Sequence, residues 1–323
     1  MIEVSIIIPT HNKAPPLRRT IKSLSSLEKR DRAVEVIVVD NASTDNTKYV
    51  VEELQKNGGL INTNLIYIYE ERMGLHFARH AGAKKAKGEI LVFIDDDIIC
   101  DGNLLNEILK SYRNLNVACV GGMILPKWEV EPPEWIHMFP KWYLSILDEG
   151  GEEREVDWIY GCNFSIRKKF LFDLGGFNPD AFADKKLWWY RGDGEIGLLK
   201  KVHRVGKKII YNPRAVVWHY IPKERLTIEY YKERAFKSGI EASFSHYYYS
   251  GDSLRSIKVL ALIGAFSLAY GLCNIVALLP YRKSIKYKVT SSYYKARLLY
   301  QLKLATDGDL RYFVQQKSWL TMT

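Results

Sequence analysis

Three adjacent carboxylates, Asp95, Asp96 and Asp97, are the side chains of this sequence most clearly arranged for chemistry. They follow Ile90 to Ile94, an uninterrupted apolar run that predicts a strand buried on both faces. Like charges this close repel one another, and a bound cation removes that cost. Because the ligand atoms are all oxygens, the cluster favours a hard divalent cation, Mg²⁺ or Mn²⁺, over zinc. The alternative is a solvated acidic turn in which Asp101 caps the next helix.

Polar residues also follow the other predicted strands of the first hundred residues. Apolar runs at residues 4–8, 34–39 and 65–69 are each followed by a stretch with helical periodicity. This alternation predicts βαβ units and a parallel sheet. Ligands bind to such sheets at the carboxyl ends of the strands, so we expect the polar tips to line one crevice. These tips are Thr10 to Lys13, Asp40, Arg72 and Asp95 to Asp97.

The residue types in that crevice favour a ligand that contains a nucleotide. Lys13 and Arg72 supply positive charge for a phosphate group, and Asp40 could accept hydrogen bonds from a base or a ribose. Each of them, taken singly, would also suit an ordinary surface charge. No Gly-x-Gly-x-x-Gly follows the first strand and no P-loop is present, which argues against a dinucleotide cofactor.

Residues 192–197, Gly-Asp-Gly-Glu-Ile-Gly, match the dinucleotide pattern letter for letter. No strand pattern precedes them, and their acidic positions would repel a pyrophosphate. The stretch instead predicts Asp193 at the N-terminus of a helix from Glu195 to Val205, where the helix dipole stabilises an anion. Asp193 would then be either a simple cap or a positioned general base. A helix and two strands are expected between Asp193 and His219.

A set of motifs runs in order along residues 1–222. The motifs are Val4 to Asn12, Val36 to Asp45, Gly74 to Glu89 with Ala78-Arg79-His80, Phe93 to Asp97, Gly161 to Arg167, Gly175 to Phe177, Gly192 to Gly197 and Val216 to His219. This ordered set resembles the family 2 glycosyltransferases of the GT-A fold. The resemblance implies an α/β fold, a Rossmann-like, mostly parallel sheet with flanking helices. It also implies a divalent cation, Mg or Mn, as cofactor.

Site residues follow from the resemblance position by position. The residues that it implies for the donor site are Pro9, Thr10, Asn12, Lys13, Asp40, Arg72, Gly74, Arg79, Asp95 and Asp96. Those implied for the metal are Asp95, Asp97 and His219. Asp193 would deprotonate the acceptor hydroxyl. The family usually has Glu-Asp before this helix and Gly192 replaces the first of the pair, so Glu195 is the alternative base.

Residues 126–160 form a loop-rich, aromatic insertion. Its aromatic residues include Trp128, Trp135, Phe139, Trp142, Tyr143 and Trp158. They could pack against the sheet, stack on an acceptor sugar or face a membrane. We favour a structure on the acceptor side without choosing among these contacts.

After Pro222 the pattern predicts helices only. Residues 259–279 contain no charged residue across 21 positions, long enough for a ~30 Å hydrocarbon core. Residues 253–306 hold nine of the basic residues behind the net charge of +10 and no acidic residue. The residues flanking the apolar stretch are Arg255, Lys258, Arg282, Lys283, Lys286 and Lys288. Basic flanks on both sides favour a helix lying in the cytoplasmic leaflet over a single crossing. The alternative is a helix buried in a helical cap or at a homo-oligomer interface.

We therefore predict a GT-A catalytic domain over residues 1–222 and a helical, basic, membrane-associating region over residues 223–323. The function expected is metal-dependent, inverting transfer from a nucleotide-sugar donor, with UDP favoured, to a glycan or lipid-linked acceptor. Such an enzyme would contribute to cell-envelope polysaccharide at the cytoplasmic, inner face of the cell membrane. The four cysteines lie far apart and form no Cys-x-x-Cys pair, so we expect neither a zinc site nor a disulfide framework, which favours a reducing compartment.

The sequence disfavours nucleic acid as a partner and a nucleotidyltransferase as the function, and leaves one further alternative. Nucleic acid is disfavoured, because apolar residues interrupt the basic run. A nucleotidyltransferase of sugar-nucleotide synthesis would need a glycine-rich, basic loop after the first strand, which is missing. A non-catalytic membrane or glycan adaptor on the same fold is the remaining alternative.

Overall fold

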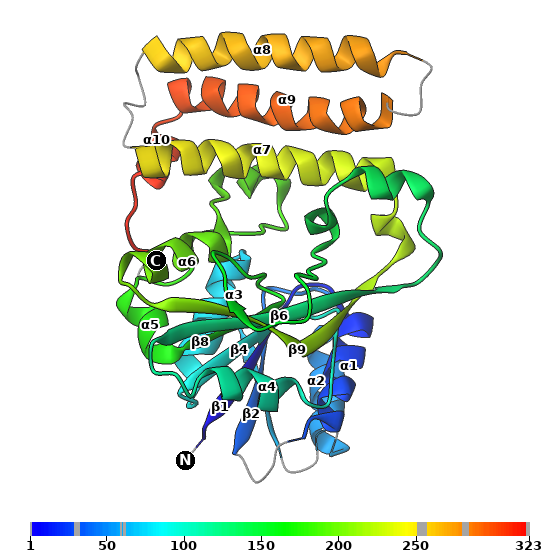
Figure 1. The fold of residues 1–323 in the computed structure, drawn as a ribbon, viewed down its shortest axis with the longest axis vertical. Helices are drawn as coiled ribbons and strands as arrows, with labels where there is room; N and C mark the ends of the chain where they lie inside the picture. The colour runs from blue at the N-terminus through cyan, green and yellow to red at the C-terminus, as the bar shows by residue number, and fades with distance from the viewer. Residues whose placement is uncertain are drawn as a thin grey trace.

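The computed structural model describes residues 2–28, 33–58, 60, 63–250, 257–279 and 284–320, and Figure 1 shows a sheet domain covered on one side by a layer of long helices. In the described chain, nine strands form one sheet in the order β3-β2-β1-β4-β8-β6-β9-β5, with β7 pairing with β9. The strands are β1 (Val4–Thr10), β2 (Val34–Asp40), β3 (Asn64–Tyr69), β4 (Ile90–Ile94), β5 (Ile98–Cys100), β6 (Val117–Trp128), β7 (Arg154–Glu155), β8 (Asn163–Arg167) and β9 (Lys208–Ile221).

The first four strands are parallel, as their alternation with helices predicts. Side chains alternate across the sheet, so Ile6 and Ile8 enter one core while Ile7 enters the other. Three helices cover each face, α1, α2 and α4 on the first and α3, α5 and α6 on the second. These helices are α1 (Ala14–Ser23), α2 (Thr47–Lys56), α3 (Leu75–Lys85), α4 (Leu104–Ser111), α5 (Lys168–Asp173) and α6 (Gly194–Arg204).

The second half of the sheet is mixed rather than parallel. Strand β8 is antiparallel to β4 and β6, and β5 is antiparallel to β9. The prediction of two strands between Asp193 and His219 is wrong, because β9 is one strand of 14 residues. Pro213 would ordinarily end a strand, but the β6–β9 ladder shifts its register there and β9 continues. The cap prediction is wrong too, since Asn103 is the N-cap of α4 and Asp101 lies in the turn before it.

Pairing of β5 with β9 brings the site together. Ile98, the residue after Asp97, is the partner of His219 in this ladder. The backbone N–H of Tyr220 also donates to the carbonyl of Asp97 at 2.9 Å. Residues more than a hundred positions apart in the sequence therefore become neighbours at the carboxyl end of β4.

Four helices follow the sheet. They are α7 (Ile228–Ser250), α8 (Ile257–Ala277), α9 (Ser284–Thr306) and α10 (Gly308–Val314). Figure 1 shows α7 next to the sheet domain, α9 above it and α8 outermost, and α9 packs against both α7 and α8. The change from sheet to helices falls after Ile221, but the division into two domains at residue 222 stays a prediction. Arg255, Arg282 and Lys283 lie outside the described residues.

Three phenylalanines support the floor of the site. The ring of Phe177 lies 5.1 Å from Phe93 and 5.4 Å from Phe164, and all three side chains are buried. Phe177 also lies 5.1 Å below the guanidinium of Arg79.

We expect Phe177→Ala to lower the free energy of unfolding by about 3–5 kcal/mol, because it leaves a cavity in this core. Urea unfolding followed by circular dichroism measures the change. Tyr49→Ala is the control, since Tyr49 is 64% exposed and its truncation should change stability little. Equal stability of the two variants would contradict this account of the core.

Candidate functional site

The three aspartates at the end of β4 have different surroundings. Asp95 opens to a cleft with 37% of its side chain exposed. Asp96 is buried and accepts a hydrogen bond from the Thr10 hydroxyl at 2.7 Å. Burial, together with the neighbouring charge of Asp97, raises the pKa of Asp96 to about 8. Asp96 therefore holds β4 against β1 and, because it is readily protonated, does not add a second open anion.

Asp97 contacts two groups from the end of β9 and the turn after it. Its Oδ2 lies 2.7 Å from Nη2 of Arg225. Its Oδ1 is buried, has no hydrogen-bond donor among the described residues and lies 3.3 Å from Nε2 of His219. The Nδ1 of His219 lies 2.8 Å from the Leu144 carbonyl, so this nitrogen donates, and the lone pair of Nε2 accepts from Nη1 of Arg225 at 2.7 Å.

A divalent cation fits this arrangement. Mn²⁺ or Mg²⁺ could use the buried carboxylate oxygen of Asp97 together with the imidazole lone pair of His219, where the ion would replace the Arg225 N–H. Among the described residues no three His, Cys, Asp or Glu side chains converge into a complete cage. A bound ion would therefore also need ligands from a substrate, and the roles of Asp95, Asp97 and His219 as ligands stay predictions.

A cavity of about 210 Å³ lies beside this acidic tip. Five of the residues predicted for the donor line it, namely Pro9, Thr10, Lys13, Asp95 and Asp96. Arg225 and Asn41 also line it and were missed from the sequence. Arg225 carried no signal, because it lies in the short turn between the last strand and the helices.

Four other predicted donor residues shape the loops around this cavity. Asp40 accepts from the Tyr67 hydroxyl and the Ser43 N–H, and Asn12 accepts from the N–H groups of Thr44 and Asp45. Arg72 pairs with Glu70 at 2.8 Å, and the Gly74 N–H donates to Asn41. None of the four lines the cavity as the described residues form it, so their contact with a donor stays a prediction.

Arg79 lies between the acidic tip and Glu195, a carboxylate at the start of α6. Its side chain is 3% exposed and lies 3.8 Å from Asp95 and 3.2 Å from Glu195. The other oxygen of Glu195 accepts from the Gly161 N–H at 3.0 Å. A Cβ at Gly161 would lie 2.2 Å from the Arg79 guanidinium, so glycine is required for this approach. Arg79 therefore fixes the position of Glu195 relative to Asp95.

Asp193 and Glu195, the two alternative bases, differ in access. The Asp193 side chain is 1% exposed and accepts hydrogen bonds from Asn178 and Tyr249 at 2.7 and 2.8 Å, while Lys200 lies 3.4 Å away. Glu195 is 16% exposed and lines two further cavities. Both carboxylates line the outer cavity, but Glu195 is the more exposed of the two and is the one that also lines the central cavity.

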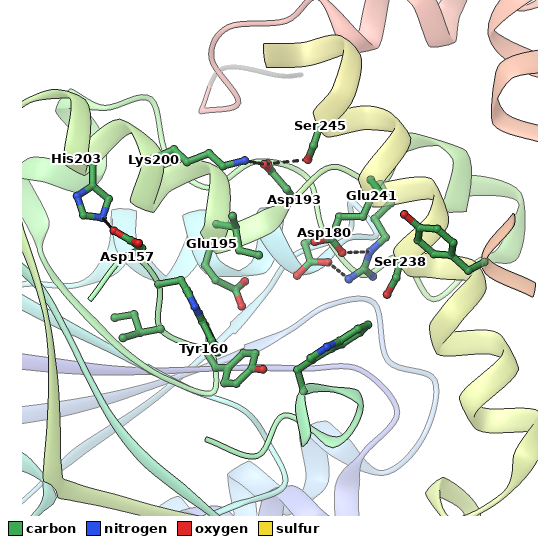
Figure 2. A pocket seen from close by; sticks show the side chains of 17 residues that line it. Asp157, Tyr160, Asp180, Asp193, Glu195, Lys200, His203, Ser238, Glu241 and Ser245 are labelled. Carbon is green, nitrogen blue, oxygen red and sulfur yellow. Dashed lines mark hydrogen bonds and ion pairs between the residues drawn. The ribbon is translucent and has the colours of Figure 1, made fainter. Parts of the chain in front are cut away.

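Those two cavities adjoin the first. A central cavity of about 270 Å³ shares Asp95 and Arg225 with the first, and an outer cavity of about 820 Å³ shares Tyr160 and Glu195 with the central one. Figure 2 shows the outer cavity between the loop at Tyr160, helix α6 with Glu195 and helix α7 with Ser238. The three cavities form one series past the acidic tip and Glu195.

The aromatic insertion has two roles. Trp135, Phe139 and Tyr143 pack around Tyr231 of α7, so these rings pack against a helix and not against the sheet, the packing that the sequence suggested. Trp142 and Trp158 are 37% and 39% exposed and line the outer cavity. The insertion therefore both anchors α7 and supplies open aromatic faces.

Comparison with known proteins gives a consistent result. The family model "Glycosyl transferase family 2" matches residues 5–183. Glucosyl-dolichyl phosphate glucuronosyltransferase of Haloferax volcanii is 23% identical over 272 residues, covering 81% of this chain and 84% of that protein. Succinoglycan biosynthesis protein ExoM of Rhizobium meliloti is 25% identical over 291 residues, covering 86% and 85%.

A solved structure shares the whole architecture. The mannosyltransferase PcManGT from Pyrobaculum calidifontis, in complex with GDP-Man and Mn²⁺, superposes with a TM-score of 0.60 at 21% identity, covering 93% of this chain and 87% of that one. This match confirms the predicted fold class, an α/β sheet with flanking helices followed by a C-terminal helical region, and the sheet itself is mixed.

We expect Asp97→Ala to weaken Mn²⁺ binding about 10- to 100-fold, because it removes the buried oxygen that has no other partner. The loss of the free-ion signal in electron paramagnetic resonance, recorded with UDP present, measures the affinity. Asp309→Ala, an exposed aspartate in α10, is the control and should bind as the unsubstituted chain does. Equal affinities of the two variants would place the ion elsewhere.

Proposed function

The chain belongs to glycosyl transferase family 2, and on that premise we propose metal-dependent, inverting transfer of a sugar from a nucleotide-sugar donor to a glycan or lipid-linked hydroxyl. The observation that carries the proposal is the series of three cavities. The acidic tip lies at the junction of the first two, and the carboxylate of Glu195 lies at the junction of the last two. Donor and acceptor would meet between them.

The donor would bind with its nucleotide in the first cavity. Lys13 and Arg225 line that cavity and supply positive charge for the diphosphate. Asp97 and His219, with Asp95, would hold a divalent cation, which when bound neutralises the leaving diphosphate. We take UDP as the nucleotide and test GDP beside it, because PcManGT was solved with GDP-Man.

Glu195 would remove the proton of the attacking hydroxyl. Its two oxygens are held by Arg79 and the Gly161 N–H, so the carboxylate is oriented before the acceptor arrives. A single displacement on the face opposite the leaving group inverts the anomeric centre. Asp193 instead joins α6 to α7 through Tyr249, which supports a structural role.

The outer cavity would bind the acceptor. Its open tryptophans, Trp142 and Trp158, offer flat apolar faces on which a sugar ring can stack. The name of the Haloferax volcanii relative gives that protein a lipid-linked acceptor, which supports the same class of acceptor here. The cavity would take the sugar end of such an acceptor.

Helix α8 would attach the enzyme to a membrane. In the described chain, Lys258–Ala277 is the one stretch long and apolar enough to cross a bilayer, and only 11% of it is buried. That exposure argues against the alternative of a core helix in a cap. Leu260, Leu268 and Ile275 are each 65–67% exposed.

The packing of α8 favours a position in the membrane plane. Helix α9 packs along α8 and contains Lys286, Lys288, Lys295, Arg297 and Lys303. Carrying these charges into hydrocarbon would be costly, whereas at the surface they would face anionic headgroups. We therefore propose that α8 lies in the inner leaflet with α9 at the headgroup level.

We expect the purified chain with Mn²⁺ to release nucleoside diphosphate from at least one donor in a panel of UDP- and GDP-sugars, supplied with lipid-linked and free glycan acceptors. Glu195→Gln should lower transfer about 10²- to 10⁴-fold, because the proton acceptor is lost, and should leave donor affinity unchanged. A coupled assay for the released diphosphate and calorimetry of donor binding measure the two quantities.

Asp193→Asn is the matched variant, since it neutralises a carboxylate two residues away. It should keep far more transfer activity than Glu195→Gln and lower the melting temperature, because a buried hydrogen-bonded group is altered. The reverse order of activities would make Asp193 the base. No release from any donor would favour the non-catalytic adaptor.

For the membrane, we expect Leu268→Glu with Leu272→Glu to reduce binding to vesicles of phosphatidylcholine and phosphatidylglycerol about tenfold or more, because two apolar side chains no longer enter the bilayer. Flotation of the vesicles measures the bound fraction. Leu115→Glu is the control, since Leu115 is 78% exposed on the sheet domain. Equal binding of the unsubstituted chain, the double variant and Leu115→Glu would contradict the role of α8.

A further inference from the structure

We propose, building on the transferase function above, that Arg234 of α7 binds a carboxylate on the transferred sugar, so that the donor is a nucleotide-linked uronic acid. The proposal concerns the central cavity, because the sugar must lie between the diphosphate and the base. Arg234 enters this cavity from the helical region rather than from the sheet.

The central cavity is rich in positive charge. Its arginine and lysine side chains are Arg79, Arg191, Arg225, Arg234 and Lys237, with His219 beside them, and its carboxylates are Asp95, Asp180 and Glu195. The outer cavity has the opposite balance. It is lined by Arg191, Lys200 and His203 on the basic side and by Asp157, Asp180, Asp193, Glu195 and Glu241 on the acidic side. An anionic group is therefore favoured in the central cavity and disfavoured in the outer one.

Four of the five cations already have ion-pair partners. Arg79 pairs with Glu195, Arg225 with Asp97, and Lys237 with Glu233 at 2.7 Å. Arg191 lies 2.7 Å from Asp180 and 3.7 Å from Glu241, the two carboxylates that also interact electrostatically with Arg234. Each of these charges is balanced within the protein.

Arg234 is the exception. Over the described residues it forms no ion pair, and its buried Nε, like those of Arg79 and Arg191, donates no hydrogen bond. The phenol groups of Tyr143 and Tyr160 are near it, and neither supplies a negative charge at neutral pH, because burial raises the pKa of both. A guanidinium with an unused buried donor, facing a cavity, lacks the planar anion that it binds best.

A uronic acid supplies that anion at the required place. Its carboxylate lies on the sugar ring, while the diphosphate is attached at the anomeric carbon. The diphosphate can therefore stay with Lys13, Arg225 and the metal site while the carboxylate pairs with Arg234. The cavity of about 270 Å³ has room on the scale of one sugar ring.

The test compares donors that differ only in this carboxylate. Calorimetry with Mn²⁺ measures the binding of UDP, UDP-glucose and UDP-glucuronic acid, and of GDP-mannose and GDP-mannuronic acid. We expect the uronic donor of one series to bind about tenfold more tightly than its neutral counterpart, the difference that one charge-assisted contact provides. Arg234→Gln should abolish this difference and leave UDP or GDP binding unchanged, and Arg234→Lys should restore part of it.

Lys232→Gln removes a charge from the exposed face of the same helix and should preserve the preference. Equal weakening of the free nucleotide and both donors by Arg234→Gln would assign Arg234 to the diphosphate and overturn the proposal. The proposal would also fail if Arg234→Gln weakened only the binding of a short polyprenyl phosphate. Transfer from a neutral donor alone would overturn it and leave the transferase function intact. Arg234-dependent uronic binding without release from any donor would support this subsite and contradict the transferase.

Discussion

Three carboxylates at the end of a buried strand concentrate more negative charge than a protein interior tolerates without compensation. Asp96 avoids the cost through burial as a hydrogen-bonded, readily protonated group beside Thr10. Asp95 and Asp97 remain, and Arg79, Arg225 and His219 surround them. These basic groups come from α3, from the end of β9 and from the turn after it, so the acidic tip holds distant parts of the chain at one place.

The same balance links the candidate site to the helical region. Arg79 spans Asp95 and Glu195, so the proposed metal ligands and the proposed base share one buried cation. Helix α6, which carries Glu195, is tied through Asp193 to Tyr249 and Ser245 of α7. Helix α7 packs on α9, and α9 packs on α8 (Figure 1). The proposed membrane helix is therefore joined to the proposed base through two packed layers, and the helical region forms a wall of the site.

The sequence predicts those features that depend on local pattern. The four parallel strands, the acidic tip and the helix with Glu195 each have a periodicity or a run of residue types. The basic groups that balance the charge of the acidic tip have no such pattern. Arg225 and Arg234 lie in a turn and on a mixed helix, where no pattern marks them, and only the β5–β9 pairing and the packing of α7 bring them inward.

Residues predicted by motif also divide by geometry. Thr10 and Lys13 line the first cavity, whereas Asp40 and Arg72 have their polar groups engaged in the surrounding loops. A motif carries over the residue type at a position, and it does not show which neighbour the side chain contacts. Pro213 is a similar case, because a proline normally ends a strand unless a register shift elsewhere accommodates it.

The central claim is that a divalent cation binds next to Asp97, whose negative charge Arg225 balances in this structure. Diffraction at the manganese absorption edge, from crystals grown with Mn²⁺ and a nucleoside diphosphate, tests it most directly. The account predicts one anomalous peak in contact with Asp97 Oδ1, His219 Nε2 and the diphosphate. A diphosphate bound beside Asp97 with no anomalous peak there, and with the Arg225–Asp97 pair unchanged, would contradict it.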